Sequence, residues 1–381
     1  MIYLDYNATT PIDPRVVDAM IPYLREIHGN PYSPHAAGRE VRAAVVRARS
    51  QVAAMLGAKP EEIVFTSGGS EANNHALKGA AWAFGDRTSR TVITSVVEHP
   101  AIHEPCRFLA DAGVKIVKVP VDGYGTVDPD DVRRAVTPDT IVISIMHANN
   151  EVGTIQPIGE IAAVAREAGV LMHTDAAQSV GKIPVNAEAL GVDLLSIAGH
   201  KFYAPQGVGV LYIRKGVKIE SLIHGAGHER GRRAGTEAVP AIVGLGAAAE
   251  IVSEQRRTDA SENIRKLRDG LHRQLTDALG DRVVLHGHPT HRLPNTLNVS
   301  FRGRIGLYLL ESLEGLCFSV GAACHSDADE PSAVLSAMGV PRDVALGAVR
   351  FSLGRPTTEA EIKEAARRVL EALNGTGSEL H

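Results

Sequence analysis

Short apolar runs alternate with helical patterns through the first two thirds of this chain of 381 residues. Between the runs, apolar residues recur at helical spacing, as in 39–56, which ends at Gly57, and in 158–168. Because parallel sheets are buried on both faces, this alternation predicts an α/β fold with a mostly parallel sheet covered by helices. The expected strands are 62–66, 91–96, 141–146, 170–175, 193–198 and 208–213.

The pattern changes beyond about residue 254 to a mixture of helices and strands that is typical of α+β domains. We interpret residues 16–253 as a large domain, and residues 1–15 together with 254–381 as a smaller one. In this division the N-terminal arm packs beside the C-terminal part. The expected elements of the smaller domain are a long helix, strands near 283 and 296–301, and helices near 305–313 and 358–373.

Four polar side chains come directly after predicted strands: His99, Asn150, Asp175 and Lys201. In open parallel sheets the ligand binds at the carboxyl ends of the strands. One site can therefore collect all four side chains.

Lys201 is the most informative of them, since a lysine at the end of a buried strand is unusual. It could extend its ammonium to water, or it could be a Schiff-base lysine whose amine is kept neutral by apolar surroundings. Another predicted strand ends in Asp175, and Gln178 follows three residues later. Pyridoxal phosphate needs a carboxylate that keeps its ring nitrogen protonated, and a donor beside its phenolic oxygen. The combination favours a pyridoxal-phosphate site.

A phosphate group needs backbone N–H groups at the start of a helix, and residues 67–70 (SGGS) can supply them between a strand and a helix. His99 could stack on the cofactor ring, although a single histidine after a strand is more often structural. Asn149 and Asn150 could be turn residues, but their position favours contact of at least one of them with the ligand.

The whole chain resembles the class V, fold-type-I pyridoxal-phosphate enzymes, which include cysteine desulfurases and selenocysteine lyases. The resemblance implies a fold-type-I PLP-dependent transferase fold, with a large domain built on a mostly parallel seven-stranded sheet and a smaller α+β C-terminal domain. The motifs that carry it are YLDYNATT (3–10), TSGGSEAN (66–73), EH (98–99), NNEVG (149–153), DAAQ (175–178), GHK (199–201), RAGTE (233–237) and VRFSLGR (349–355).

The resemblance also implies roles for individual residues. Lys201, Cys324 and His99 would be catalytic, and Asn150 and Arg350 would bind the substrate carboxylate. Thr236 would reach the phosphate of the neighbouring subunit, which implies a homodimer with shared sites. The implied cofactor-binding residues are Gly69, Ser70, His99, Asn150, Asp175, Gln178, His200, Lys201 and Thr236.

The chain departs from many desulfurases at Ala198, where they carry a serine that helps to hold the phosphate. The sequence around Cys324, GAACHSD (321–327), and the absent serine are more similar to selenocysteine lyases. We therefore expect a selenocysteine lyase that forms alanine and selenide. The alternative is a cysteine desulfurase that forms a persulfide on Cys324 and passes sulfur to an acceptor protein.

Two other classes are weighed against this interpretation. An aminotransferase would share Asp175 and Lys201 but would not need a cysteine in a loop. A scaffold without activity is disfavoured because Lys201, Asp175 and Arg350 are all present. The histidines of 286–291 (HGHPTH) have metal-like spacing, yet no acid or cysteine joins them locally, so we expect no metal site.

Composition limits the partners and the compartment. A formal net charge of -4 gives no general attraction to nucleic acid or to an anionic membrane, and no apolar run approaches the roughly 20 residues of a membrane helix. The first residues lack the features of a signal peptide. Three cysteines in a chain of this length indicate a reducing compartment rather than a disulfide framework, so we expect a cytoplasmic protein.

Overall fold

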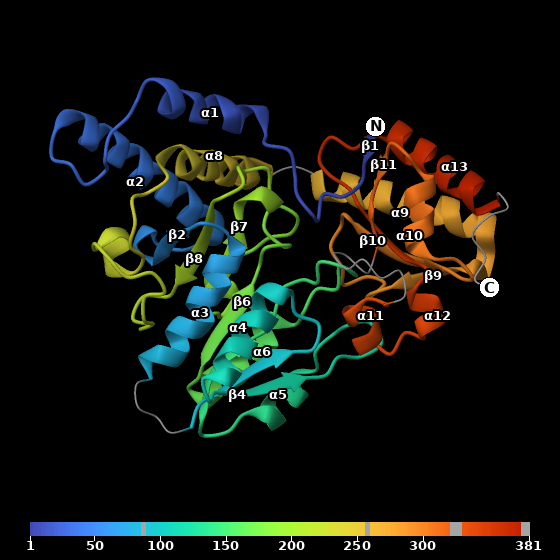
Figure 1. Cartoon of the computed structure of the whole chain (residues 1–381), viewed down its shortest axis with the longest axis horizontal. Coiled ribbons are helices and arrows are strands. Elements are labelled where there is room, and N and C mark those ends of the chain that lie inside the picture. Colours follow the sequence, from blue (N-terminus) through green and yellow to red (C-terminus); the bar gives the residue numbers. More distant parts are fainter. Residues whose placement is uncertain (85–88, 256–259, 321–329, 375–381) are drawn as a thin grey trace.

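The computed structural model of the chain describes residues 1–84, 89–255, 260–320 and 330–374. Its larger part contains a seven-stranded sheet with the order β2-β8-β7-β6-β5-β3-β4 (Figure 1). The strands are β2 (Ile63–Thr66), β3 (Thr91–Ser95), β4 (Lys115–Val119), β5 (Thr140–Ser144), β6 (Leu171–Asp175), β7 (Leu194–Ala198) and β8 (Gly209–Ile213).

The sheet is mostly parallel, as predicted. The neighbours β3-β4, β3-β5, β5-β6 and β6-β7 run parallel, whereas β8 is antiparallel to both β2 and β7. Successive side chains of a strand point to opposite faces. In β5, Val142 packs with α3 and α4 on one face, and Ile143 joins the core formed with α2, α6 and α8 on the other. Burial on both faces explains why these strands are apolar throughout.

Helices cover both faces of this sheet (Figure 1). One face is covered by α2 (Ala36–Leu56), α6 (Ile158–Ala168) and α8 (Val239–Gln255), and the other by α3 (Gly69–Ala83) and α4 (Pro100–Asp111). The part of the chain with described coordinates has no helix that combines the length and the apolar character required to cross a bilayer.

The second part is built on a four-stranded antiparallel sheet with the order β12-β13-β10-β9, and it has its own apolar core. The N-terminal arm belongs to this core: β1 (Ile2–Tyr3) pairs in parallel with β11 (Leu316–Cys317), and Leu4 is fully buried there. The elements are α9 (Ala260–Leu279), β9 (Val283–His286), β10 (Thr296–Phe301), α10 (Gly306–Ser312), β12 (Ser319–Val320), β13 (Ala348–Ser352) and α13 (Glu359–Asn374). The division at 15/16 and 253/254 stays a prediction.

Sequence patterns missed several elements for identifiable reasons. Helix α1 (Pro14–Arg25) and α4 contain internal prolines, Pro22 and Pro105, which read as helix breakers. Strand β4 lies at the edge of the sheet and carries exposed lysines, so it shows no continuous apolar run. The remaining short helices are α5 (Pro129–Ala135), α7 (Ala187–Leu190), α11 (Ala333–Ala337) and α12 (Arg342–Ala345).

Candidate active site

A cavity of about 280 Å³ opens at the carboxyl ends of the central strands. The structure brings the four predicted strand-end residues to this one cavity. Asp175 is the last residue of β6, Lys201 ends a short 3₁₀ turn after β7, and His99 precedes α4. The lining is formed by Gly69, Ser70, Asn73, His99, Ala101, Met146, Ala148, Asn150, Asp175, Ala177, Gln178, Ala198, His200 and Lys201.

The backbone around Lys201 is tightly held. A Cβ on Gly199 would lie 2.9 Å from the carbonyl oxygen of Val208, so the 3₁₀ turn can only lie this close to β8 with glycine there. Two residues after the lysine, Tyr203 has a φ of 70°, which is a strained value for a side chain of this size. The Tyr203 N–H donates to Thr10 Oγ1 at 2.8 Å, and its hydroxyl accepts from the Arg355 N–H at 2.7 Å. These contacts fix the direction in which Lys201 points.

The Lys201 amine rests against the N-terminal arm. Its Nζ donates to the carbonyl oxygens of Asn7 and Ala8, both at 2.7 Å. Burial and the positive charge of Arg350 lower the pKa of Lys201 from 10.5 to about 8, against the opposing effect of Asp175. An amine with this pKa is partly neutral near physiological pH, as a nucleophilic lysine must be.

Asp175 is buried, and the protein fixes both of its carboxylate oxygens. Oδ2 accepts from Asn73 Nδ2 at 2.7 Å, and Oδ1 accepts from the Ala177 N–H at 2.9 Å. These two donors fix the orientation of the carboxyl group. The arrangement suits a carboxylate that holds a protonated ring nitrogen.

His99 lies at the edge of the cavity and caps α4. Its Nδ1 accepts from the Ala101 N–H at 3.0 Å, so the proton of the neutral ring is on Nε2. The cap holds the imidazole plane in one orientation, which a stacking residue needs.

Helix α3 offers an anion site at its first turn. Gly68 precedes it with a φ of 153°, and no side chain within the described ranges caps the helix. A Cβ on Gly209 would lie 2.7 Å from the Gly68 backbone, so glycine in β8 allows the two segments to touch. The first N–H groups of the helix, together with the Ser70 side chain, are therefore available to a phosphate.

His200 and Ala198 complete this end of the cavity. His200 Nδ1 lies 3.1 Å from Thr9 Oγ1, and burial together with Lys201 lowers the pKa of His200 to about 4, so its ring is neutral. Ala198 lines the cavity, as the sequence predicted, and Ser70 carries the one hydroxyl group among the described lining residues.

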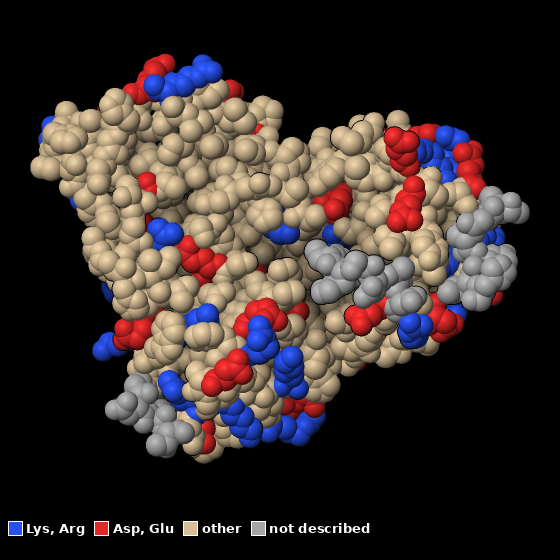
Figure 2. All heavy atoms as spheres, in the orientation of Figure 1, with Lys and Arg blue, Asp and Glu red and all other residues tan. Residues whose placement is uncertain are grey.

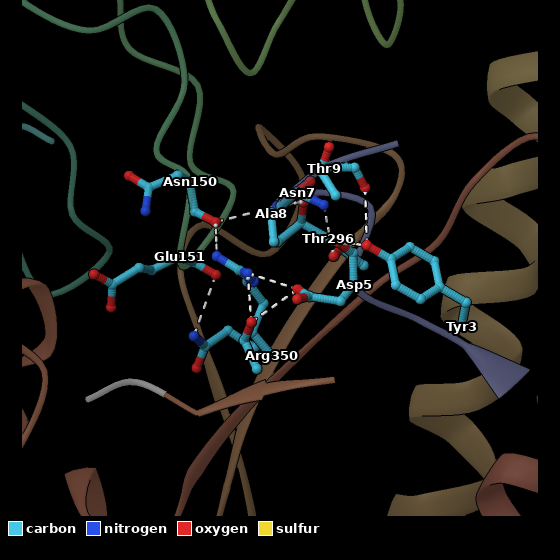
Figure 3. A network of polar contacts seen from close by, with 12 residues as sticks. Tyr3, Asp5, Asn7, Ala8, Thr9, Asn150, Glu151, Thr296 and Arg350 are labelled. Atoms are coloured by element: carbon cyan, nitrogen blue, oxygen red, sulfur yellow. Dashed lines mark hydrogen bonds and ion pairs between the residues drawn. The ribbon is translucent and has the colours of Figure 1, made fainter. Parts of the chain in front are cut away.

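Arg350 of β13 lies beside the cavity, outside its lining, and holds Asn150 (Figure 3). Its Nη1 donates to the Asn150 carbonyl oxygen at 2.9 Å, and its Nη2 donates to Asp5 Oδ1 at 2.8 Å and to Ser319 Oγ at 2.7 Å. The Nε group is buried and has no partner among the described residues. An unsatisfied buried donor of this kind suits an incoming carboxylate.

The structure adds residues to which the sequence analysis gave no role. Asn7 and Ala8 contact the Lys201 amine, and Asn73 supports Asp175. A weak signal exists for Asn73, because a fully buried asparagine on an Ala-rich helix needs a partner. Asn7 and Ala8 carry no local signal, since their partners lie nearly 200 residues away.

The last two predicted residues are Cys324 and Thr236. Cys324 lies outside the described residues. Thr236 is exposed and does not line the cavity of its own chain, which is compatible with the expectation that it reaches a neighbouring subunit.

The other cysteines and the histidine stretch have structural surroundings. Cys106 is buried in α4, and burial raises the pKa of its thiol to about 12, far too high for a nucleophile at neutral pH. His286 Nε2 lies 2.6 Å from Ser300 Oγ, while His288 Nδ1 accepts from the His291 N–H. The parts of the chain that the structure describes contain no cluster of metal-ligating side chains.

Comparison with known proteins places the whole chain in one group. The Aminotransferase class-V family profile matches residues 2–364. The cysteine desulfurase IscS of Dictyoglomus turgidum is 49% identical over 377 residues, which cover 98% of this chain and 95% of that protein. The cysteine desulfurase of Homo sapiens is 44% identical over 373 residues, 97% of this chain and 81% of that protein.

Comparison with solved structures leads to the same group of proteins. A NifS-like protein has a TM-score of 0.91 at 42% identity, covering 98% of this chain and 99% of that chain. SspA in complex with cysteine has a TM-score of 0.82 at 33% identity, covering 94% and 100%. The predicted fold-type-I transferase fold is confirmed.

The chain therefore belongs to the class-V aminotransferase family. It is an enzyme that depends on pyridoxal phosphate, and its relatives are cysteine desulfurases. The cavity fits this cofactor, since a partly neutral lysine, a fixed carboxylate and a free helix N-terminus face it together.

Proposed function

We propose that this protein is a cysteine desulfurase, which converts L-cysteine to L-alanine and retains the sulfur on Cys324. The observation that carries the proposal is full-length similarity to cysteine desulfurases, combined with a cavity that both Lys201 and Asp175 line. A related solved structure, that of SspA, holds cysteine. These relatives support the alternative weighed from the sequence better than the selenocysteine lyase that we preferred.

In this proposal several lining residues have defined tasks toward the cofactor and the substrate. Lys201 attaches it and then moves the substrate α-proton, and Asp175 keeps its ring nitrogen protonated. The first turn of α3, with Gly69 and Ser70, holds the phosphate together with His200. When bound, pyridoxal phosphate supplies the electron sink that allows the bond between Cβ and sulfur to break.

Four further residues act around the ring and the substrate. His99 stacks on the ring face, and Gln178 donates to the phenolic oxygen. Arg350 receives the substrate carboxylate on its unpartnered Nε, with Asn150 beside it. A substrate carboxylate at this position gives the buried Nε–H of Arg350 an acceptor. Substrate binding therefore removes the free-energy cost of a buried donor that has no partner.

The sulfur step needs the thiolate of Cys324. Its Sγ attacks the substrate sulfur, a sulfur–sulfur bond forms, and the bond from Cβ to sulfur breaks. The electron pair of that bond stays with the three-carbon fragment, which takes up protons and leaves as alanine. The persulfide on Cys324 then passes its outer sulfur to an acceptor protein, with no oxidant required.

The proposed assembly is a homodimer with shared sites. The segment that carries Thr236 is anchored through Arg233, whose Nε donates to Glu71 Oε1 at 2.9 Å in the first turn of α3. From there the exposed Thr236 is free to contact a second copy. Figure 2 shows fewer charged side chains on the upper left of this view than on its lower part, although α2 itself exposes Arg39, Glu40, Arg42 and Arg47.

Alanine release from L-cysteine, measured in the wild type and in Cys324→Ala, tests the function. We expect the variant to lose cysteine turnover, and mass spectrometry should find one added sulfur atom on the Cys324 peptide of the wild type. Cys317→Ala is the matched control, because its partly buried thiol lies outside the cavity. Undiminished turnover by Cys324→Ala would disprove the sulfur step.

The same assay with L-selenocysteine separates the two substrates. A desulfurase should turn over both amino acids at comparable rates. Fast release from selenocysteine with negligible release from cysteine would restore the selenocysteine lyase.

A further inference from the structure

Asn7 is one of the residues that fasten the N-terminal arm to the site. Its carbonyl oxygen accepts from Lys201 Nζ at 2.7 Å and from Gln178 Nε2 at 3.0 Å. The position of the Lys201 amine therefore depends on what fixes Asn7.

Every polar atom of the Asn7 side chain has a partner. Its Nδ2 donates to Thr296 Oγ1 at 2.9 Å and to the Asn150 carbonyl oxygen at 3.1 Å (Figure 3). Its Oδ1 accepts from Asn295 Nδ2 at 3.0 Å and from Lys182 Nζ at 2.9 Å. Since the Asn150 carbonyl can only accept, the amide cannot be flipped.

Lys182 joins this side chain to Gln178. Its Nζ donates to Gln178 Oε1 at 2.5 Å as well as to Asn7 Oδ1. Gln178 follows β6 by three residues and lines the cavity, and Lys182 is four residues further along the same turn. One amine thus holds the oxygens of two amides, both of which lie next to Lys201.

The surroundings of Lys182 are unusual for a lysine. Both of its hydrogen-bond partners are neutral amides, and no carboxylate of the described residues forms a salt bridge with it. Burial, and then the positive charges of Lys201 and Arg350, lower the pKa of Lys182 well below 10.5. A lysine is seldom retained in such a place for stability alone, because desolvation of the amine has a cost that two neutral hydrogen bonds barely offset.

We propose that Lys182 is a positioning residue, which holds the amides of Gln178 and Asn7 so that Gln178 presents an N–H to the cofactor and the Asn7 carbonyl receives the Lys201 amine. With Oε1 on Lys182 and one N–H on the Asn7 carbonyl, the remaining N–H of Gln178 is free toward the cavity. A donor at that point stabilises an ionised phenolic oxygen. The inference rests on the proposed roles of Gln178 and Lys201 but not on the identity of the amino-acid substrate.

The test compares the full-length wild type with Lys182→Met, Gln178→Met and the double variant. Two readouts are independent of turnover: the dissociation constant of pyridoxal phosphate, and the pH dependence of the visible absorption of the bound cofactor. Lys182→Met should weaken cofactor binding by about 3- to 10-fold, the effect of losing one or two neutral hydrogen bonds, and should shift the absorption titration. In the Gln178→Met background the same change should produce a much smaller shift, since the amide that Lys182 orients is gone.

Lys363→Met, on the exposed face of α13, is the matched control for loss of a lysine. The proposal would be overturned if Lys182→Met had the same absorption titration and cofactor affinity as the wild type. It would also be overturned if Lys182→Met caused the full shift in the Gln178→Met background. If Lys182→Met does not fold, Lys182→Gln takes its place: a smaller shift in the same direction is expected, and none would overturn the proposal. Absence of cysteine turnover would refute only the proposed function, because both readouts are taken without substrate.

Discussion

The acidity of Lys201 leads to the most direct test of the site. With its pKa lowered from 10.5 to about 8, the fraction of neutral amine at neutral pH is about 300-fold larger than for an ordinary lysine. Because only the neutral amine attacks the aldehyde, this fraction should control how fast the cofactor-depleted protein captures pyridoxal phosphate.

The capture rate is measured from the change in visible absorption between about pH 6.5 and about pH 10, and Lys201→Ala supplies the baseline. Nα-acetyl-lysine in the same buffers corrects for protonation of the cofactor itself, once its rate is divided by the neutral fraction of its own amine. The corrected rate should rise about tenfold per pH unit up to about pH 8 and then level off. A protein profile that keeps rising in parallel with Nα-acetyl-lysine above pH 9 would refute the reasoning, since it would mean that Lys201 keeps an ordinary pKa.

Three other substitutions give separable results. Asp175→Asn should weaken cofactor binding by about 10- to 150-fold, because a charge-assisted hydrogen bond contributes about 1.5–3 kcal/mol. Equilibrium dialysis measures the dissociation constant of the cofactor, and a change below about threefold would contradict the role of Asp175. Arg350→Gln should raise the KM for cysteine about tenfold or more with little effect on cofactor affinity, and a change in cofactor affinity alone would assign Arg350 to the phosphate. Burial raises the pKa of Glu98 from 4.5 to about 8, so its stabilising effect is complete below about pH 4.5 and is lost as the pH rises through about 8. Glu98→Gln should remove this contribution to the free energy of unfolding. Urea unfolding of the wild type and of the variant at about pH 5 and about pH 8 measures it, and the same pH dependence in both proteins would contradict the prediction.

The large sheet could be predicted from the sequence because its strands are buried on both faces and therefore apolar throughout. Strand β10 was placed at its observed bounds, and Gly57 ends α2 in the left-handed conformation that a glycine stop requires. The missed elements lack such a pattern. The edge strand β4 has no continuous apolar run, and α1 and α4 contain prolines that interrupt the helical spacing.

The site was predictable where residues follow strands and was not where distant segments meet. Parallel topology alone implies that Asp175 and Lys201 share an edge of the sheet. No periodicity indicates that Asn7 lies on Lys201, because that contact depends on the pairing of β1 with β11 in the other sheet. The roles assigned to these residues remain predictions until the variants are measured.

The electrostatics of the cavity connect these observations. Lys182, Lys201 and Arg350 lie within reach of one another, and each lowered lysine pKa reflects burial plus repulsion from its cationic neighbours. Asp175 and Asp5 oppose this effect at Lys201 but do not cancel it. An anionic cofactor and a substrate carboxylate are therefore drawn to the site, while burial, together with the same positive charges, keeps Lys201 partly neutral before they arrive. In this arrangement the cations that attract the ligands also contribute, after burial, to the lowered pKa of the nucleophile.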